Sequence, residues 1–319
     1  MLQNKVHRRI LVIKHGALGD IVQALDAFAS LRAGNPHAHI ALMTSPVFLS
    51  LAKMMPWFDE VIVDPRAGIL NLAAAWRIRQ YFRQDWPVIV DMQCSSRTRN
   101  YFAHFVPSNT RWIGTASGCS DPLPDFAGVN NCDRMVTTAK MAGGILQSPD
   151  MSWLVNGATQ TDDPVVMIND KQYAVLIPGC SLAKPQKRWP ADRFAAIGNE
   201  LAARGFEIVL VGTADDRDAV NAVLAASPNA IDLCGKTNLG GLARLLGGAA
   251  FVIGNDTGPM FLAARTGVPS LMIMGPDTDP TMSAPIGVAA SWLQGTTISE
   301  ISVAAAIDAL ESLGLKPNT

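Results

Sequence analysis

Short, continuously apolar runs alternate with amphipathic segments along nearly the whole chain, and this alternation restricts the fold more than any other feature. The expected strands are Ile10–Ile13, His39–Met43, Val61–Val63, Val88–Asp91, Arg111–Ile113, Tyr173–Ile177, Glu207–Val211, Phe251–Gly254 and Ser270–Met274. The expected helices lie between them, at residues 20–33, 69–84, 97–105, 133–145, 191–204, 215–226, 238–247 and 258–266. Continuous apolar strands separated by helices are typical of parallel sheets that are covered on both faces.

A turn-rich stretch near residues 147–171 interrupts this pattern, which then runs a second time. The stretch contains two prolines and a pair of adjacent aspartates, as is typical of a linker between domains. The length of 319 residues also favours two domains, at roughly 150 residues each. We expect two doubly wound α/β domains, 1–150 and 151–319, whose strand-end loops face a central cleft. A last helix at 299–313, with Ser299 as its cap, could pack on either domain, including back on the N-terminal one.

The composition excludes several classes of protein. Apolar residues make up 49% of the chain and charged residues 17%, so it is not a disordered charged tail and should form substantial cores. The formal net charge is −1, without the overall basic field of nucleic-acid-binding proteins. Residues 1–150 hold 15 Lys/Arg and 11 Asp/Glu, whereas residues 151–319 hold 11 and 16. An anionic partner should therefore meet the N-terminal half.

Cysteine and histidine spacing predicts neither disulfides nor a metal site. The five cysteines and five histidines are scattered, without a C-x-x-C pair or a metal-ligand motif. The apolar run Ile10–Ile13 is too short for a signal peptide, and no uncharged apolar stretch reaches the roughly 18 residues of a membrane span. We expect a cytoplasmic protein that uses no metal and no cofactor.

The loop after the first expected strand carries a candidate catalytic residue. It reads KHGALGD from Lys14 to Asp20 and leads into a helix. Asp20 could act chemically, or it could cap the helix, with Gln23 completing a capping box. The G-x-x-G spacing matches neither a dinucleotide fingerprint nor a P-loop.

A second group of candidates follows the strand Phe251–Gly254. Asp256, Thr257, Gly258 and Pro259 lead into another helix, and proline suits the first turn of a helix. The unpaired amides of that turn form a site for a phosphate or diphosphate. Alternatively, Asp256 or Thr257 only caps the helix.

A basic loop follows the first strand of the second domain. After Ser181 it contains Lys184, Lys187 and Arg188, which could neutralise a leaving diphosphate or form a solvated basic loop. The next residue, Trp189, should anchor the following helix by packing.

Arginine and aromatic residues interleave in the N-terminal half. The residues are Trp76, Arg77, Arg79, Tyr81, Phe82, Arg83 and Trp86, followed by Arg97 and Arg99. Ala75, Ile78 and Phe82 have helical spacing and should face the core. The remaining arginines and tryptophans could rest on an anionic membrane surface, hold an anionic acceptor, or form a solvated helix face.

Together these residues resemble the family 9 glycosyltransferases, whose best-known members are the ADP-heptose:lipopolysaccharide heptosyltransferases. The resemblance covers nearly the whole chain. Its motifs are ILVIKxxxLGD, VIVDMQ, KRWP at 187–190, GKTNL at 235–239 and NDTG at 255–258. The resemblance implies a GT-B fold, in which two Rossmann-like domains face each other and the second holds the nucleotide-sugar.

The resemblance also implies roles for the matched residues. Asp20 corresponds to the proposed general base. Gly19 and Arg97 would bind the acceptor, with Arg97 at a basic position for its anionic group. The residues that would contact the donor are Ser181, Lys187, Thr237, Leu239, Asp256, Thr257 and Gly258. Inverting transfer needs a base for the acceptor hydroxyl and stabilisation of the leaving diphosphate, and these residues would supply both without a metal.

The predicted function is inverting transfer of a heptose or related sugar from a nucleotide-diphosphate donor, with ADP-heptose the first choice. The acceptor would be a lipopolysaccharide core or similar anionic glycan, reached by peripheral contact with the inner membrane. Phe261 stands where heptosyltransferases usually have His, and Leu239 opens a turn that often carries an acidic residue, so sugar and base stay open. The alternatives are a non-catalytic binding protein and a nucleotide-sugar epimerase, for which Asp256 is the only evident carboxylate.

Overall fold

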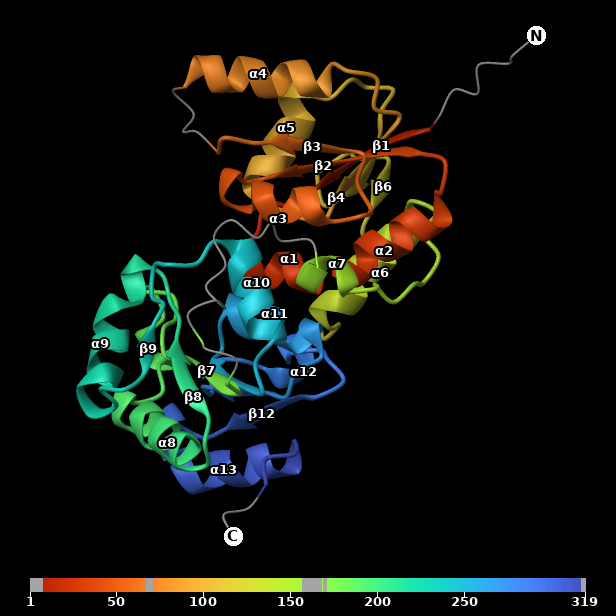
Figure 1. The fold of residues 1–319 in the computed structure, drawn as a ribbon. Helices are drawn as coiled ribbons and strands as arrows, with labels where there is room; N and C mark the ends of the chain where they lie inside the picture. Colours follow the sequence, from red (N-terminus) through yellow and green to blue (C-terminus); the bar gives the residue numbers. More distant parts are fainter. Residues whose placement is uncertain (1–7, 67–70, 157–167, 169–170, 317–319) are drawn as a thin grey trace. The chain divides into compact units, whose positions relative to one another are not determined.

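The computed structural model describes residues 8–66, 71–156, 168 and 171–316. The chain divides into two compact units, Met1–Asp150 and Met151–Thr319 (Figure 1). Each unit contains a six-stranded parallel sheet in which strands alternate with helices along the chain. The α/β fold class predicted from the apolar runs is confirmed.

The N-terminal unit is built on the strand order β3-β2-β1-β4-β5-β6. Its strands are β1 (Arg9–Ile13), β2 (His39–Thr44), β3 (Glu60–Val63), β4 (Val88–Asp91), β5 (Arg111–Gly114) and β6 (Asp121–Pro122). Its helices are α1 (Leu18–Gln23), α2 (Leu25–Gly34), α3 (Leu49–Met54), α4 (Leu72–Phe82), α5 (Ser96–Phe105) and α6 (Asn131–Met141). In the centre of the sheet, Ile10 of β1 pairs with Ile40 on one side and Val88 on the other.

The core of this unit forms where apolar strand residues meet one face of each helix. Ile78 and Phe82 of α4 are buried against the sheet, as predicted, together with Tyr101 of α5. Ala74 completes the buried stripe of α4, whereas Ala75 is only half-buried. The predicted helical periodicity is therefore confirmed for Ile78 and Phe82, but the alanine that faces the core is Ala74 and not Ala75.

The C-terminal unit has the strand order β12-β11-β10-β7-β8-β9. Its strands are β7 (Tyr173–Ile177), β8 (Glu207–Leu210), β9 (Ile231–Asp232), β10 (Phe251–Asn255), β11 (Ser270–Met274) and β12 (Ala290–Gln294). Its helices are α7 (Ser152–Asn156), α8 (Ala191–Ala203), α9 (Arg217–Ala226), α10 (Leu239–Gly247), α11 (Gly258–Thr266), α12 (Pro280–Ser283) and α13 (Val303–Ser312).

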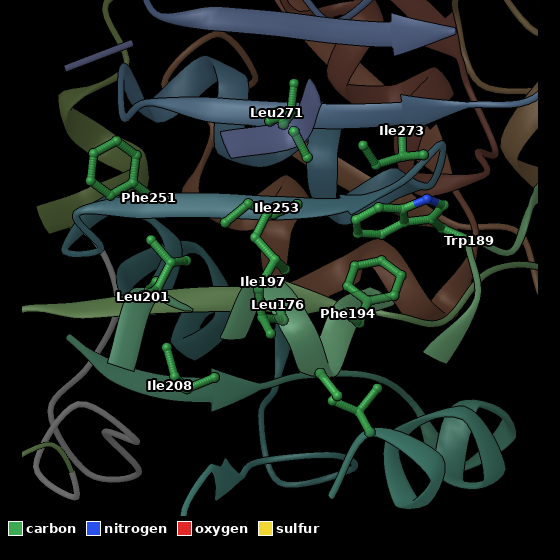
Figure 2. Packing of buried hydrophobic residues seen from close by; sticks show 14 of the residues in the cluster. Leu176, Trp189, Phe194, Ile197, Leu201, Ile208, Phe251, Ile253, Leu271 and Ile273 are labelled. Atoms are coloured by element: carbon green, nitrogen blue, oxygen red, sulfur yellow. The ribbon is translucent and has the colours of Figure 1, made fainter. Parts of the chain in front are cut away.

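Trp189 joins the core of the C-terminal unit, as Figure 2 shows. It is 2% exposed and packs edge-on against Phe194 of α8. Its indole Nε1 donates to the carbonyl of Ile301 at 2.9 Å, so burial leaves no polar atom of the ring unpaired. The predicted anchoring role of this tryptophan is confirmed.

Several elements differ from the prediction. The expected helix 20–33 is two helices, because α1 ends at Gln23 and α2 begins at Leu25. β6 and β9 have two residues each, and β12 mixes half-buried and exposed residues. These edge strands lack the continuous apolar run that marks a strand buried on both faces.

The expected cap of the last helix is wrong. Helix α13 begins at Val303, and Ser302 caps it by accepting a hydrogen bond from the Ala305 amide at 3.1 Å. Ser299 lies in a separate 3₁₀ turn, Ile298–Glu300. Helix α13 packs on α8, β11 and β12 of its own unit, and its apolar side enters the core of that unit through Ala306 and Leu310.

Candidate functional site

In each unit, polar side chains gather at the carboxyl edge of the sheet. In the N-terminal unit, main-chain hydrogen bonds continue the ladder beyond the strands. The amide of Lys14 donates to the Met43 carbonyl at 3.0 Å, and the amide of Met92 donates to the Ile13 carbonyl at 3.1 Å. The segments that follow β1, β2 and β4 therefore lie side by side, and their side chains share one edge.

Asp20 lies in the first turn of α1 and does not cap it. The helix begins at Leu18, and the cap residue is Ala17, which has no side-chain acceptor. Gln23 is the last residue of the helix, so the expected capping box is wrong because the helix begins two residues earlier than expected. The Asp20 carboxylate is half-buried and makes no hydrogen bond or ion pair within the described ranges. Its carboxylate is thus available for chemistry.

Lys14 is a buried cation on the same loop as Asp20. It is 3% exposed, and its Nζ donates to the Met92 carbonyl at 3.3 Å. Burial lowers the pKa of Lys14, while the nearby carboxylates of Asp20 and Asp91 act in the opposite direction. Gly19, which precedes Asp20 in the sequence, is buried in α1. The loop therefore carries a buried cation within electrostatic range of the candidate base.

His15 and Asp64 form a buried pair beside this loop. Both side chains are 1% exposed, and His15 Nε2 lies 3.0 Å from Asp64 Oδ2. The Tyr101 hydroxyl donates to the same oxygen at 2.7 Å, and the Arg66 amide donates to Oδ1 at 2.7 Å. Burial alone would raise the pKa of Asp64, but these hydrogen bonds outweigh it and hold the pKa below its usual value. Asp64 is therefore an ionised acceptor at neutral pH.

The main chain of His15 is hydrogen-bonded to side chains from the loops that follow β2 and β4. Its amide donates to Gln93 Oε1 at 2.9 Å, and its carbonyl accepts from Ser45 Oγ at 2.6 Å. The next residue, Gly16, has φ +102, and a Cβ there would lie 2.2 Å from a ring carbon of Phe48. Only glycine fits this bend, so the start of the loop that carries Asp20 has one defined path.

Arg97 lies in a cavity of about 530 Å³ in the same unit, which His15, Asp64 and Tyr101 also line. Its guanidinium donates to the Tyr101 hydroxyl at 3.2 Å and to the Arg66 carbonyl at 3.2 Å. Burial and the Asp64 carboxylate raise the pKa of Tyr101, so this hydroxyl remains a donor. The structure thus brings Arg97 to the His15–Asp64 pair, while no hydrogen bond of the described chain joins Arg97 to Asp20.

Two residues that line or border this cavity have strained backbones. Arg66 has φ 51 and Cys94 has φ 49, and they are the non-glycine residues with positive φ in the described part of the chain. They lie three residues beyond the ends of β3 and β4. Residues held in this region cost roughly 1–3 kcal/mol each and cluster at functional sites. The strain supports the view that this edge binds a ligand.

In the C-terminal unit, Lys187 and Asp256 form an ion pair. The Lys187 ammonium contacts Asp256 Oδ2, and the two side chains are 14% and 6% exposed. Thr278 Oγ1 donates to the same oxygen at 2.6 Å. The alternative that Asp256 caps α11 is therefore wrong, because its carboxylate is directed to Lys187 and Thr278. Thr257 occupies the cap position, but its side chain makes no capping hydrogen bond.

Asn255, the last residue of β10, ties the basic loop to this pair. Its Oδ1 accepts from the Trp189 amide at 2.9 Å, and its Nδ2 donates to the Pro178 carbonyl at 2.7 Å. Both ends of the loop after β7 are thereby fixed against β10. Gln294 of β12 donates to the carbonyl of Thr278 at 2.6 Å. The loops that follow three neighbouring strands are thus held in register around Asp256.

Helix α11 begins next to this ion pair. Gly258 is its first residue and Pro259 its second. The amides of a first helical turn lack intrahelical partners and carry the positive end of the helix dipole. Of the other cations in the basic loop, Arg188 donates to the Cys180 carbonyl at 3.1 Å and Lys184 is exposed. Lys187 and the start of α11 therefore combine two sources of positive potential at one place.

The remaining predicted donor residues lie in the segments after β7 and β9, at the same edge of the sheet. Ser181 is exposed at the start of the loop after β7. Thr237 and Leu239 follow β9, the edge strand, where Asn238 caps α10 by accepting from the Gly241 amide at 2.8 Å. Among the described residues, no hydrogen bond joins these three positions to Lys187 or Asp256.

Phe261 is 8% exposed and lies in the second turn of α11. Its phenyl ring offers no polar atom to a ligand.

The sequence did not point to Asp64, Tyr101 or Thr278. Asp64 had a signal, because it directly follows the apolar run Val61–Val63 and therefore stands at a strand end. Tyr101 and Thr278 had none, since they reach their partners through tertiary contacts.

Two further findings bear on the chemistry of the molecule. In the described ranges, no group of three or more His, Cys, Asp or Glu side chains is arranged to hold a metal ion. No helix of those ranges is both long and apolar enough to cross a bilayer.

Comparison with known proteins finds a match to one family. Residues 145–303 match the model of glycosyltransferase family 9 (heptosyltransferase). Lipopolysaccharide heptosyltransferase 1 of Escherichia coli (strain K12) is 31% identical over 297 residues, which span 85% of this chain and 89% of the relative.

Solved structures agree in fold over the whole length. A family 9 glycosyltransferase from Veillonella parvula DSM 2008 superimposes with a TM-score of 0.80 at 21% identity, covering 96% of this chain and 97% of that one. E. coli heptosyltransferase WaaC, solved with ADP, gives a TM-score of 0.77 at 19% identity, covering 96% and 100%. The two parallel sheets thus form a GT-B fold. Because the E. coli heptosyltransferase 1 is 31% identical over 85% of this chain, the chain belongs to glycosyltransferase family 9 and is a glycosyltransferase.

Proposed function

We propose that the protein is an inverting heptosyltransferase that uses ADP-heptose and an anionic lipopolysaccharide core or similar glycan. The observation that carries the proposal is the Lys187–Asp256 pair at the start of α11. The names of the relatives support the heptose and the lipopolysaccharide, and the ADP in a structural neighbour supports the adenine. We also propose that the protein works in the cytoplasm, in peripheral contact with the inner membrane.

On the donor side, Lys187 and the first amides of α11 would bind the diphosphate. Negative charge builds on the diphosphate as the glycosidic bond breaks, and fixed positive groups stabilise that charge most. Thr257 and Gly258 stand at the turn where a phosphate could approach the backbone closely. Asp256, which holds Lys187 in place, would accept hydrogen bonds from sugar hydroxyls through its remaining oxygen. Ser181, Thr237 and Leu239 would contact the more distant parts of the nucleotide.

On the acceptor side, Asp20 would act as the general base. The acceptor oxygen attacks the anomeric carbon from the face opposite the diphosphate, the bond to the diphosphate oxygen breaks, and the nucleoside diphosphate leaves. Asp20 takes the hydroxyl proton in that step, and the configuration inverts. Arg97 and the exposed Arg66, at the cavity beside His15, would bind an anionic group of the acceptor.

A non-catalytic binding protein is the second candidate, and Phe261 favours it. This buried phenyl ring cannot replace the hydrogen bonds of a histidine toward a donor sugar. Against this candidate, Asp20 has no structural partner in the described chain that would explain its presence at the start of α1. An epimerase is less suitable, because it needs two acid/base carboxylates around the sugar, and Asp256 is already paired with Lys187.

The test is the Asp20→Asn variant, assayed for ADP release with ADP-heptose and a core acceptor. Loss of a general base should lower kcat about 100-fold or more while the thermal shift produced by ADP stays unchanged. Asp85→Asn, which changes an exposed aspartate of the same unit, is the matched control and should behave as wild type. Unchanged turnover in Asp20→Asn would remove this residue from the mechanism. A thermal shift with UDP or GDP in place of ADP would discard the proposed donor.

A further inference from the structure

Helix α4 presents a second, outward stripe opposite its buried one. The stripe consists of residues at spacings of four, three and four, namely Leu72, Trp76, Arg79 and Arg83. Arg83 is the residue that ends the helix. Such spacing places side chains on one face of a helix. Leu72 is 79% exposed and Trp76 is 62% exposed, and both arginines are exposed as well.

The exposure of Trp76 is unusual within its own unit. Trp86 and Trp112 are 2% and 0% exposed, and Trp57 is 8% exposed. Trp86, which the sequence grouped with the same patch, is covered instead by the Arg9 guanidinium at 4.0 Å from the ring. The aromatic part of the patch is therefore Trp76, next to Leu72.

The charged side chains of the helices that form this face have one sign. Helix α5 packs against α4 (Figure 1). The two helices, with Arg83 at the end of α4, carry five arginines and no aspartate or glutamate. The arginines are Arg77, Arg79, Arg83, Arg97 and Arg99. We call the exposed side of these two helices the α4–α5 face. Four of these arginines are exposed, whereas Arg97 is half-buried and donates to Tyr101. An apolar pair set among exposed arginines fits an anionic surface.

We propose that the α4–α5 face docks on an anionic lipid bilayer. Tryptophan and leucine enter the boundary between head groups and acyl chains, and arginines pair with anionic head groups. A second copy of this chain fits the face less well, because a symmetric contact would bring the two arginine stripes together. The inference rests on the proposed function in one respect, namely that the acceptor is carried on a lipid.

The position of the cavity beside the face gives the docking a purpose. Ala74, Ala75 and Ile78 of α4 form one wall of the 530 Å³ cavity, and Arg97 and Tyr101 of α5 contribute to another. A bilayer on the outward stripe would therefore lie on the other side of α4 from the cavity that we assign to the acceptor. The sugars of a glycolipid project from the bilayer surface, so they would extend past α4 to the cavity while the lipid stays in the membrane.

The test is flotation of the full-length chain with vesicles of phosphatidylcholine, with and without 30% phosphatidylglycerol. Wild type should float with the anionic vesicles alone, and less as salt rises. Arg79→Gln/Arg83→Gln should lower the partition coefficient about 30-fold, because the attraction of two arginines to anionic head groups is lost. Leu72→Gln/Trp76→Gln should lower it about 10-fold or more, because less apolar surface is buried. Far-ultraviolet circular dichroism should show both variants folded, because the four side chains are exposed.

Matched controls remove exposed cations and an exposed tryptophan elsewhere. Lys53→Gln/Lys140→Gln deletes two exposed cations of the same unit, and Trp292→Gln deletes a tryptophan that is 42% exposed on β12. Both should float as wild type. Equal loss in the controls, equal binding to neutral vesicles, or no binding at all would overturn the proposal. A dimer in light scattering that the α4–α5 variants abolish would assign the face to a second copy instead.

Transfer to a delipidated, water-soluble acceptor separates this inference from the proposed function. The α4–α5 variants should retain that activity within about twofold, since none of the four residues lines the cavity, and should lose activity on the vesicle-bound acceptor. If wild type fails to transfer to either acceptor, the proposed function fails, while flotation still decides whether the face binds a bilayer.

Discussion

Replacing Lys187 by methionine should separate its structural role from its chemical one. The Lys187 and Asp256 side chains are 14% and 6% exposed, and Thr278 donates to the same carboxylate oxygen at 2.6 Å. Methionine keeps most of the volume and removes the charge. Breaking a buried pair by removing one partner costs about 3–5 kcal/mol, because the other charge stays behind without compensation.

The expected cost here is lower, at about 2 kcal/mol, because Lys187 retains some contact with solvent and Thr278 still stabilises Asp256. For a unit of this size such a loss lowers Tm by about 4–8 °C, which differential scanning calorimetry resolves. Transfer activity should fall further, by about 10²–10³-fold in kcat, since a fixed cation at the leaving diphosphate would be missing.

The double variant Lys187→Met/Asp256→Asn provides the decisive comparison. It leaves no unpaired charge at the site, so the free energy of unfolding should return to within about 1 kcal/mol of wild type. Activity should stay at least about 100-fold low, because the cation is still absent. If the second substitution restores activity together with stability, Lys187 only neutralises Asp256, and its assignment to the diphosphate is refuted.

Two further predictions concern the N-terminal unit. Hydrogen bonds hold the pKa of Asp64 below its usual value, so its contribution to stability is present above about pH 4 and is lost as pH falls through the folded-state pKa. Asp64→Asn should therefore cost about 1–3 kcal/mol at pH 7 and flatten the loss of stability below about pH 4, as measured by urea unfolding; an unchanged acid profile would show that the fold does not stabilise the Asp64 carboxylate. Gly16→Ala should destabilise the unit by about 2 kcal/mol or more, because φ is +102 and the new Cβ would meet the Phe48 ring at 2.2 Å. Since Gly16 lies in the loop that carries Asp20, kcat in the ADP-release assay should fall as well, and wild-type stability and kcat would show that the bend is not needed.

The sequence alone predicted the central strands of both sheets well. Tyr173–Ile177 and Ser270–Met274 match residue for residue, because a strand covered on both faces must be apolar at consecutive positions. It also pointed to Lys187, Asp256 and Asp20, since each follows a strand of a parallel α/β sheet and such strand ends carry ligands. These signals are local, so they can be read along the chain.

The edge strands and the partners of the site residues could not be predicted from the sequence. β12 escaped prediction because its residues are partly exposed, and α1 could not be separated from α2 because both continue one amphipathic pattern. Asp20 and Asp256 each had a capping alternative that the chain alone left open. The structure excludes both caps. Helix α1 begins before Asp20, and the Asp256 carboxylate pairs with Lys187.

What the sequence determined was the identity of the elements and the loops that carry polar groups. What only the tertiary structure decided was which of those loops meet. Lys187 reaches Asp256 because β7 and β10 are neighbours in the sheet, and His15 meets Asp64 across the end of β2, which lies between β1 and β3. Strand order depends on how both faces of a sheet are packed by helices, which is a property of the whole unit, whereas periodicity depends only on residues close together in the chain.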